Sequence, residues 1–153
     1  MVDKVTGFIR AIVICLFRNG SRILVAEGFD PSKNERFLRP LGGAIDFGET
    51  GLRALEREIA EELGQPIEKP AFLGVIENLF TYGGEQGHEI VFVFDAQFAD
   101  RSLYQCQRIP GCESDGAAFE AVWLNLADDA PSRLPLYPDG LRQFIDERED
   151  AKR

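Results

Sequence analysis

A run of seven consecutive apolar residues, from Ala11 to Phe17, limits the folds open to this chain more than any other feature. A strand covered on one face alternates apolar and polar residues, whereas an uninterrupted run is typical of a strand covered on both faces. A polar turn at residues 18–21, which contains Asn-Gly, and a second apolar segment at residues 22–26 follow it. Residues 8–17 and 22–26 are therefore predicted to form a β-hairpin within a covered sheet.

The clearest helix prediction covers residues 50–63. Its apolar residues recur at the spacing of one helix face: Leu52, Leu55, Ile59 and Leu63. Thr50 is placed to cap the start, and Gly64 with Pro66 ends the helix. This segment should therefore cover one face of the sheet.

The rest of the chain is predicted to complete a mixed sheet between helices. The strands expected are 71–81 and 89–98, joined through residues 82–87, and 120–124. Gly28 to Arg36 and residues 99–116 are expected to be loops, and an Asp- and Pro-rich turn precedes an amphipathic helix at about 138–149, with Leu141, Phe144 and Ile145 on its apolar face. No linker or repeat divides the chain, so residues 1–153 are predicted to be one α/β domain.

The charge of the chain excludes some partners. Lys and Arg number 17 against 26 Asp and Glu, which gives a formal charge of -9. Such a surface repels polyanions, so binding to polymeric nucleic acid or to anionic lipid is not expected. The longest apolar run falls far short of the ~20 residues that cross a bilayer. A small phosphate ligand carried with a metal ion remains compatible with the charge.

The cysteines and the first residues favour the cytoplasm. Cys15, Cys106 and Cys112 leave one thiol unpaired in any disulfide scheme, and we expect all three to be reduced. Residues 1–6 lack the basic start and apolar stretch of a secretory signal. His88 is the sole histidine, which disfavours a histidine-based zinc site.

The predicted helix at 50–63 carries several acids on a single face. With about 100° per residue, Glu61 lies about 60° to one side of Glu58 and Glu62 about 40° to the other. Arg57 is one turn from Glu61 and within reach of it. Like charges at these spacings cost roughly 0.2–0.5 kcal/mol per pair, a penalty that a divalent cation would reverse. Hard oxygen ligands of this kind suit Mg²⁺ or Mn²⁺.

The residues before the helix belong to the same pattern. Gly42 and Gly43 can bring the backbone close to a ligand, and Glu49 adds a carboxylate at the helix start. Residues 43–65 resemble the Nudix box, which reads Gly, five residues, Glu, seven residues, Arg-Glu, an aliphatic, any residue, Glu-Glu, any residue, Gly and an aliphatic. The matching residues are Gly43, Glu49, Arg57, Glu58, Ile59, Glu61, Glu62 and Gly64. Gln65 departs from the final aliphatic position, which concerns only a contact at the helix exit.

The resemblance implies a Nudix-type α/β/α sandwich with a mixed sheet and a MutT-like hydrolase. The implied reaction is Mg²⁺-dependent hydrolysis of the pyrophosphate bond in a nucleoside diphosphate linked to another moiety, with Mn²⁺ as a substitute. Nucleotide sugars, ADP-ribose-like compounds, dinucleoside polyphosphates and nucleoside triphosphates all fit the box. The alternative is a non-catalytic nucleotide-binding sensor. Homodimers are common among similar enzymes, and the oligomeric state stays open.

The resemblance also implies roles for individual residues. Glu58 and Glu62 would bind metal with the backbone of Gly43, and Glu61 would bind metal or take the proton from the attacking water. Arg57 would orient these carboxylates and Glu49 would complete the cluster. Gly42, Glu49 and Tyr82 are the predicted substrate contacts, Tyr82 because dinucleoside-polyphosphate-cleaving relatives place a tyrosine close to this offset.

The general base in similar enzymes sometimes lies outside the box. The candidates in the second half of the chain are Glu85, Glu89, Glu113 and Glu120. Glu120 is the first choice, because its position before the apolar segment 121–124 resembles that of catalytic or metal-associated acids in relatives.

Overall fold

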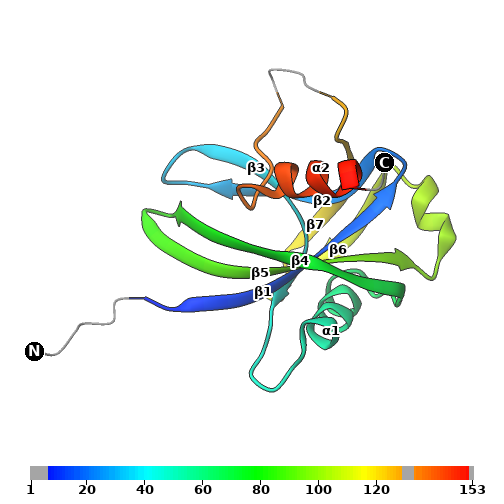
Figure 1. The fold of residues 1–153 in the computed structure, drawn as a ribbon, viewed down its shortest axis with the longest axis horizontal. Helices are drawn as coiled ribbons and strands as arrows, with labels where there is room; N and C mark the ends of the chain where they lie inside the picture. Colours follow the sequence, from blue (N-terminus) through cyan, green and yellow to red (C-terminus); the bar gives the residue numbers. More distant parts are fainter. Residues whose placement is uncertain (1–6, 129–132, 152–153) are drawn as a thin grey trace, which may run out of the picture.

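The computed structural model describes residues 7–128 and 133–151, and its core is a seven-stranded sheet with α1 and α2 on opposite faces (Figure 1). The elements are β1 (Ile9–Asn19), β2 (Arg22–Asp30), β3 (Glu35–Ala44), α1 (Gly51–Leu63), β4 (Ile67–Tyr82), β5 (Glu85–Phe98), the 3₁₀ helix η1 (Arg101–Gln105), β6 (Arg108–Cys112), β7 (Ala118–Asn125) and α2 (Leu141–Ala151). The strand order is β4-β5-β1-β3-β2-β7-β6, with β1 parallel to β5 and the other pairs antiparallel. The predicted mixed sheet between helices is confirmed.

Strand β1 lies near the middle of the sheet and is buried on both faces, as its apolar run predicts. Val13, Cys15 and Phe17 belong to the core beneath α1, whereas Ile14 and Leu16 belong to the core beneath α2. Burial raises the pKa of the Cys15 thiol well above its usual value. Cys15 is buried, whereas Cys106 and Cys112 are exposed, and none of the three forms a disulfide in the structure.

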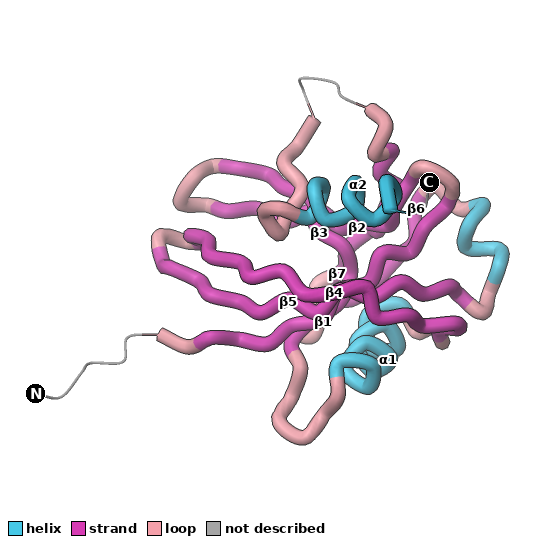
Figure 2. Tube along the Cα trace, in the orientation of Figure 1, coloured by secondary structure: helices cyan, strands magenta, loops and turns pink. Residues whose placement is uncertain are grey.

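Strand β3 changes partner along its length, and this opens the sheet at one end. Its residues 41–44 pair with β1, and its residues 35–40 pair with β2. The β2–β3 and β4–β5 hairpins consequently project to the same edge of the molecule as separate arms (Figure 2). Asp30 joins them, because its carboxylate accepts a hydrogen bond of 3.1 Å from the backbone N–H of Gly83.

Two predicted loops are wrong. Most of the segment 28–36 continues the β2–β3 hairpin, and the segment 99–116 contains η1 and strand β6. Both segments lie mostly in water, one on the projecting arm and the other at the edge of the sheet, where Ile109 is the buried residue of β6. Their sequences therefore lack the apolar alternation of a buried strand. Strands β4 and β5 likewise run longer than predicted, and residues 129–132 of the Asp- and Pro-rich turn lie outside the described residues.

The predicted helices on the two faces of the sheet are present, with α2 beginning later than expected, at Leu141. Leu141, Phe144 and Ile145 are its buried residues, as predicted from their spacing. Within the described ranges, neither helix has the length and apolar content needed to cross a lipid bilayer.

Candidate active site

Helix α1 is fixed in place by its caps and its buried face. The Thr50 hydroxyl oxygen accepts a hydrogen bond of 3.2 Å from the Arg53 N–H, and Gly64 ends the helix at a φ of 67°, in the left-handed region that favours glycine. Ala54, Leu55 and Ile59 are buried against the sheet. The acidic face of the helix is therefore held beside strand β3.

Arg57 is the centre of an ion-pair network around this face. Its guanidinium donates two hydrogen bonds of 2.8 Å to Glu49, one of 2.9 Å to Glu58 and one of 3.4 Å to Glu61. A further bond of 3.0 Å reaches the carbonyl oxygen of Ala44 at the end of β3. Arg57 therefore ties the loop before α1, the helix and the sheet together.

Gly43 leaves the space that the Glu58 carboxyl group occupies. A Cβ atom at Gly43 would lie 2.4 Å from Cδ and 2.5 Å from both carboxylate oxygens of Glu58. Gly42 has a different role, because its φ is 154° and a Cβ there would lie 1.9 Å from the backbone oxygen of Val13. Gly43 accommodates the acidic cluster, whereas Gly42 permits the close pairing of β3 with β1.

Glu62 lies close to two other acids, Glu58 and Glu113. Burial, followed by the charges of Glu113 and Glu58, raises its pKa to about 8, and Glu62 also shares a hydrogen bond with Glu58. Arg39 opposes the shift and lies 3.8 Å from Glu113. A proton thus holds two carboxyl groups together at neutral pH, as a cation would.

The donor set fits a hard divalent cation. In the described part of the chain, no group of three or more His, Cys, Asp or Glu side chains is already arranged to hold a metal ion. The Glu58 and Glu62 carboxyl groups nevertheless lie close together beside Gly43, and the raised pKa of Glu62 indicates that Arg57 and Arg39 do not fully compensate their charge. Glu58 would need to turn partly from Arg57 to contribute both oxygens.

The acidic face of α1 forms part of a cavity of about 640 Å³. The cavity lies where the two hairpin arms separate, and its lining includes residues from β1, β3, β4, β5 and the segment before α2. Among its described lining residues, eight are carboxylic acids and three are Lys or Arg. A polyanion could enter such a cavity only with accompanying cations.

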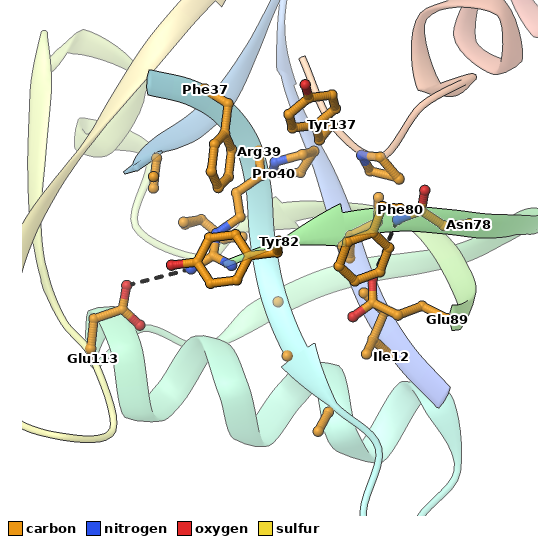
Figure 3. Close-up of a pocket in the computed structure, with 18 of the residues that line it drawn as sticks. Ile12, Phe37, Arg39, Pro40, Asn78, Phe80, Tyr82, Glu89, Glu113 and Tyr137 are labelled. Carbon is orange, nitrogen blue, oxygen red and sulfur yellow. Dashed lines mark hydrogen bonds and ion pairs between the residues drawn. The ribbon is translucent and has the colours of Figure 1, made fainter. Parts of the chain in front are cut away.

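Aromatic side chains line the part of the cavity between the hairpin arms (Figure 3). The ring centroids of Phe37 and Tyr137 are 5.3 Å apart, and those of Phe37 and Tyr82 are 6.4 Å apart in an edge-to-face arrangement. The Tyr82 hydroxyl donates a hydrogen bond of 3.1 Å to the Phe29 carbonyl oxygen. These rings offer apolar surface to a flat or hydrophobic part of a ligand.

The structure brings most of the predicted site residues into this cavity. Those that line it are Gly42, Gly43, Glu58, Glu61, Glu62 and Tyr82. Arg57 and Glu49 lie behind the acidic face instead, and both oxygens of Glu49 are occupied, by Arg57 and by the Asp46 N–H. They support the lining residues from outside the cavity.

Glu120 lies apart from the acidic cluster. Its neighbours Phe119 and Ala121 pack toward the α1 side of the sheet, so alternation along β7 turns Glu120 to the opposite side. Its carboxylate pairs with Arg108 at 2.6 Å, and 53% of its side chain is exposed. Of the four second-half acids considered, Glu89 and Glu113 line the cavity.

Some cavity residues were not predicted from the sequence. Arg39 follows an apolar pair in β3, and nothing in its spacing marks it as the partner of Glu113. Asn78 had a weak signal, because it lies on the same face of β4 as the apolar residues Ile76 and Phe80. An amide at an inward strand position is uncommon unless it has a partner.

The comparisons with known proteins identify one family. The NUDIX domain model matches residues 7–146 of the chain. The matched segment contains the acidic helix and every strand of the sheet.

Solved structures share the fold at low sequence identity. A MutT NUDIX hydrolase from Burkholderia pseudomallei is 24% identical with a TM-score of 0.64, over 91% of this chain and 97% of that chain. A MutT protein from Methanosarcina mazei Go1 is 19% identical with a TM-score of 0.66, over 98% of this chain and 99% of that chain. A protein described as an ADP compounds hydrolase is 17% identical with a TM-score of 0.64, over 95% of this chain and 76% of that chain.

Proposed function

The chain belongs to the NUDIX domain family and is a Nudix pyrophosphohydrolase, and we propose that it uses Mg²⁺ to hydrolyse a small nucleoside diphosphate derivative. The bond cleaved is the pyrophosphate linkage, by attack of water on one phosphorus. The leaving group is a nucleotide, a sugar phosphate or inorganic pyrophosphate, according to the substrate.

The observation that carries this proposal is the excess of acidic over basic residues in the cavity lining, which only bound cations would balance. Eight acids against three basic residues make a poor site for a phosphorylated ligand alone. Divalent cations between these acids and a pyrophosphate would satisfy both. A small-molecule nucleotide derivative also suits a cavity of about 640 Å³.

Glu58 and Glu62 would hold the metal, with Glu61 and the backbone of Gly43 beside them. When bound, Mg²⁺ neutralises the charge of the pyrophosphate oxygens and lowers the pKa of water. Glu58 is oriented by Arg57 at 2.9 Å, and Arg57 is itself held by Glu49. The protein therefore positions its acids through a network that lies outside the cavity.

Glu61 and Glu113 are the acids best placed to take a proton from the attacking water. Glu61 lines the cavity on α1, with 54% of its side chain exposed, and Glu113 lines it from the far side, beside Arg39. Glu120 is the third candidate, although its pairing with Arg108 directs it elsewhere. Rate profiles against pH for Glu61→Gln, Glu113→Gln and Glu120→Gln separate the three, because loss of the base removes the acidic limb of the profile.

The central test is a hydrolysis screen over nucleotide sugars, dinucleoside polyphosphates and nucleoside triphosphates. We expect nucleoside monophosphate or pyrophosphate to be released with Mg²⁺ and the release to stop with EDTA. Glu58→Gln and Glu62→Gln should each lower the rate at least 100-fold, whereas Glu56→Gln, on an exposed part of the same helix, should not. Tight nucleotide binding without turnover across the screen would instead support a sensor.

A further inference from the structure

Three glycine–phenylalanine pairs flatten aromatic rings against the sheet around the cavity. Gly28 faces Phe37, Gly87 faces Phe80 and Gly111 faces Phe119 across neighbouring strands. A Cβ atom at these glycines would lie 2.4, 2.2 and 2.3 Å from the facing ring. Each ring lies flat over its glycine, because no Cβ atom prevents this, and so it occupies less of the cavity than a ring pointing away from the sheet would. All three phenylalanines line the cavity.

Phe80 is accompanied by two polar side chains. Asn78 lies two residues earlier on β4 and faces Glu89 on β5, and its Nδ2 is 3.4 Å from the Glu89 Oε1. Figure 3 shows these three side chains together on one side of the cavity, with Arg39 and Glu113 on the other. Asn78 thus orients an acid beside a flattened ring.

Asn78 also has unused hydrogen-bonding capacity. The residue is 7% exposed, and its Oδ1 is buried without a hydrogen-bond partner among the described residues. An unpaired buried carbonyl group is destabilising, and in native proteins such a group usually meets a ligand or an ordered water. The amide and the Glu89 carboxylate together make this side of the cavity rich in acceptors.

From this arrangement we infer that Phe80, Asn78 and Glu89 form a subsite for a guanine-type base. A carboxylate accepts two parallel hydrogen bonds, and guanine offers two adjacent donors on one edge, its N1–H and its 2-amino group. Adenine and cytosine place an acceptor nitrogen beside their amino group, which the second carboxylate oxygen would repel. The flat face of Phe80 provides the stacking surface, and the inference rests on the proposed hydrolysis of nucleotide derivatives.

The charge of this side of the cavity disfavours a second phosphate. Arg10 on β1 faces Glu89 on β5, but no ion pair joins Glu89 to a basic side chain within the described residues. The lining acids Glu35 and Asp30 have hydrogen-bond partners of their own. A neutral group that donates hydrogen bonds suits this environment better than an anion. The phosphates would therefore lie toward α1, and the base toward β4 and β5.

Two measurements test the subsite. The first is calorimetric binding of GMP, IMP and AMP in the presence of Mg²⁺; IMP keeps the N1–H but lacks the 2-amino group. We expect GMP to bind about 10-fold more tightly than IMP, with AMP weakest. The second is the ratio of kcat/KM for GTP to that for ITP, which should also be about 10.

The variants separate recognition from folding. Glu89→Gln should bring both ratios to within about 2-fold of unity, and Asn78→Ala should lower them partway, whereas Glu77→Gln, exposed on the same strand, should leave them unchanged. Phe80→Leu should weaken GMP and IMP equally, since it removes stacking and not the polar contacts. Thermal unfolding of each variant confirms that it is folded.

The outcomes also distinguish this inference from the proposed function. Selective GMP binding without hydrolysis would retain the subsite and reject the proposed reaction. Hydrolysis with equal use of GTP, ITP and ATP, or a wild-type ratio in Glu89→Gln, would overturn the subsite alone. Absence of binding for all three monophosphates would also overturn it.

Discussion

The guanidinium of Arg57 holds the carboxylate of Glu49 through two hydrogen bonds of 2.8 Å, although the two residues lie on different sides of the helix start. This pair of hydrogen bonds, called here the Arg57–Glu49 fork, connects the loop before α1 to the helix that carries the acids. Because Arg57 also contacts Glu58 at 2.9 Å, the position of a cavity acid depends on a residue outside the cavity. Such supporting contacts commonly affect metal sites as strongly as some ligands do.

We expect Glu49→Gln to lower kcat about 10- to 100-fold, because one member of the fork loses its charge and Arg57 can shift toward Glu58. The Mg²⁺ concentration for half-maximal activity should rise in parallel. Steady-state kinetics over a Mg²⁺ series measure both effects. Glu56→Gln is the matched control, and a wild-type Mg²⁺ response in Glu49→Gln would contradict the supporting role of the fork.

The same ion pair predicts a dependence of stability on pH. Hydrogen bonds from Arg57, then from the Asp46 N–H, lower the pKa of Glu49 from 4.5 to about 2. The unfolded chain binds the proton first, so the contribution is complete above about pH 4.5 and disappears as the pH falls toward 2. Urea unfolding should therefore show a gap between wild type and Glu49→Gln at pH 7 that narrows below pH 4. A constant gap would exclude this origin.

Glu62 predicts the opposite slope in a higher pH window. Its pKa is raised from 4.5 to about 8 by burial and by Glu113 and Glu58, so the metal-free folded protein binds a proton that the unfolded chain has released. Stability in EDTA should fall as the pH rises from about 4.5 to 8. Melting temperatures at several pH values measure the slope, which Glu62→Gln should reduce. Mn²⁺ should raise the wild-type melting temperature most at the upper end of this window.

The two neighbouring glycines of β3 should respond differently to the same substitution. Gly43→Ala meets only the end of the Glu58 side chain, so we expect a folded protein whose activity is at least 10-fold lower. Gly42→Ala meets the backbone of Val13 and should lower the melting temperature substantially. Gly51→Ala is the control, since its Cβ would make an ordinary contact at 3.4 Å. Equal activity of Gly43→Ala and wild type would contradict the role given to the space beside Glu58.

Sequence patterns were sufficient to predict the elements whose buried residues form a continuous apolar run or recur at the spacing of a helix. The two-sided run in β1 and the spacing of Leu55 and Ile59 in α1 predicted the sheet and the helix that covers it. The exposed β2–β3 arm and strand β6 could not be predicted in this way, because most of their side chains face water and their apolar residues follow no regular spacing.

The candidate site likewise has a part that could be predicted from the sequence and a part that could not. Acids on one helix have relative positions that the helix repeat determines, so the arrangement of Glu58, Glu61 and Glu62 could be predicted. The Arg39–Glu113 and Asn78–Glu89 contacts depend on which strands are neighbours, and local spacing carries no such information. Glu120 was the first choice for a general base outside the box because of its position along the chain. The side of the sheet to which its side chain points depends instead on the pleat of β7.

The separation of the two hairpin arms by the partner change in β3 has an evolutionary consequence. The acids that would perform the chemistry come from α1, and the groups that would choose the ligand come from β4 and β5. Substitutions in one element need not disturb the other, so a descendant of this chain can acquire a new preference while its reaction is inherited intact.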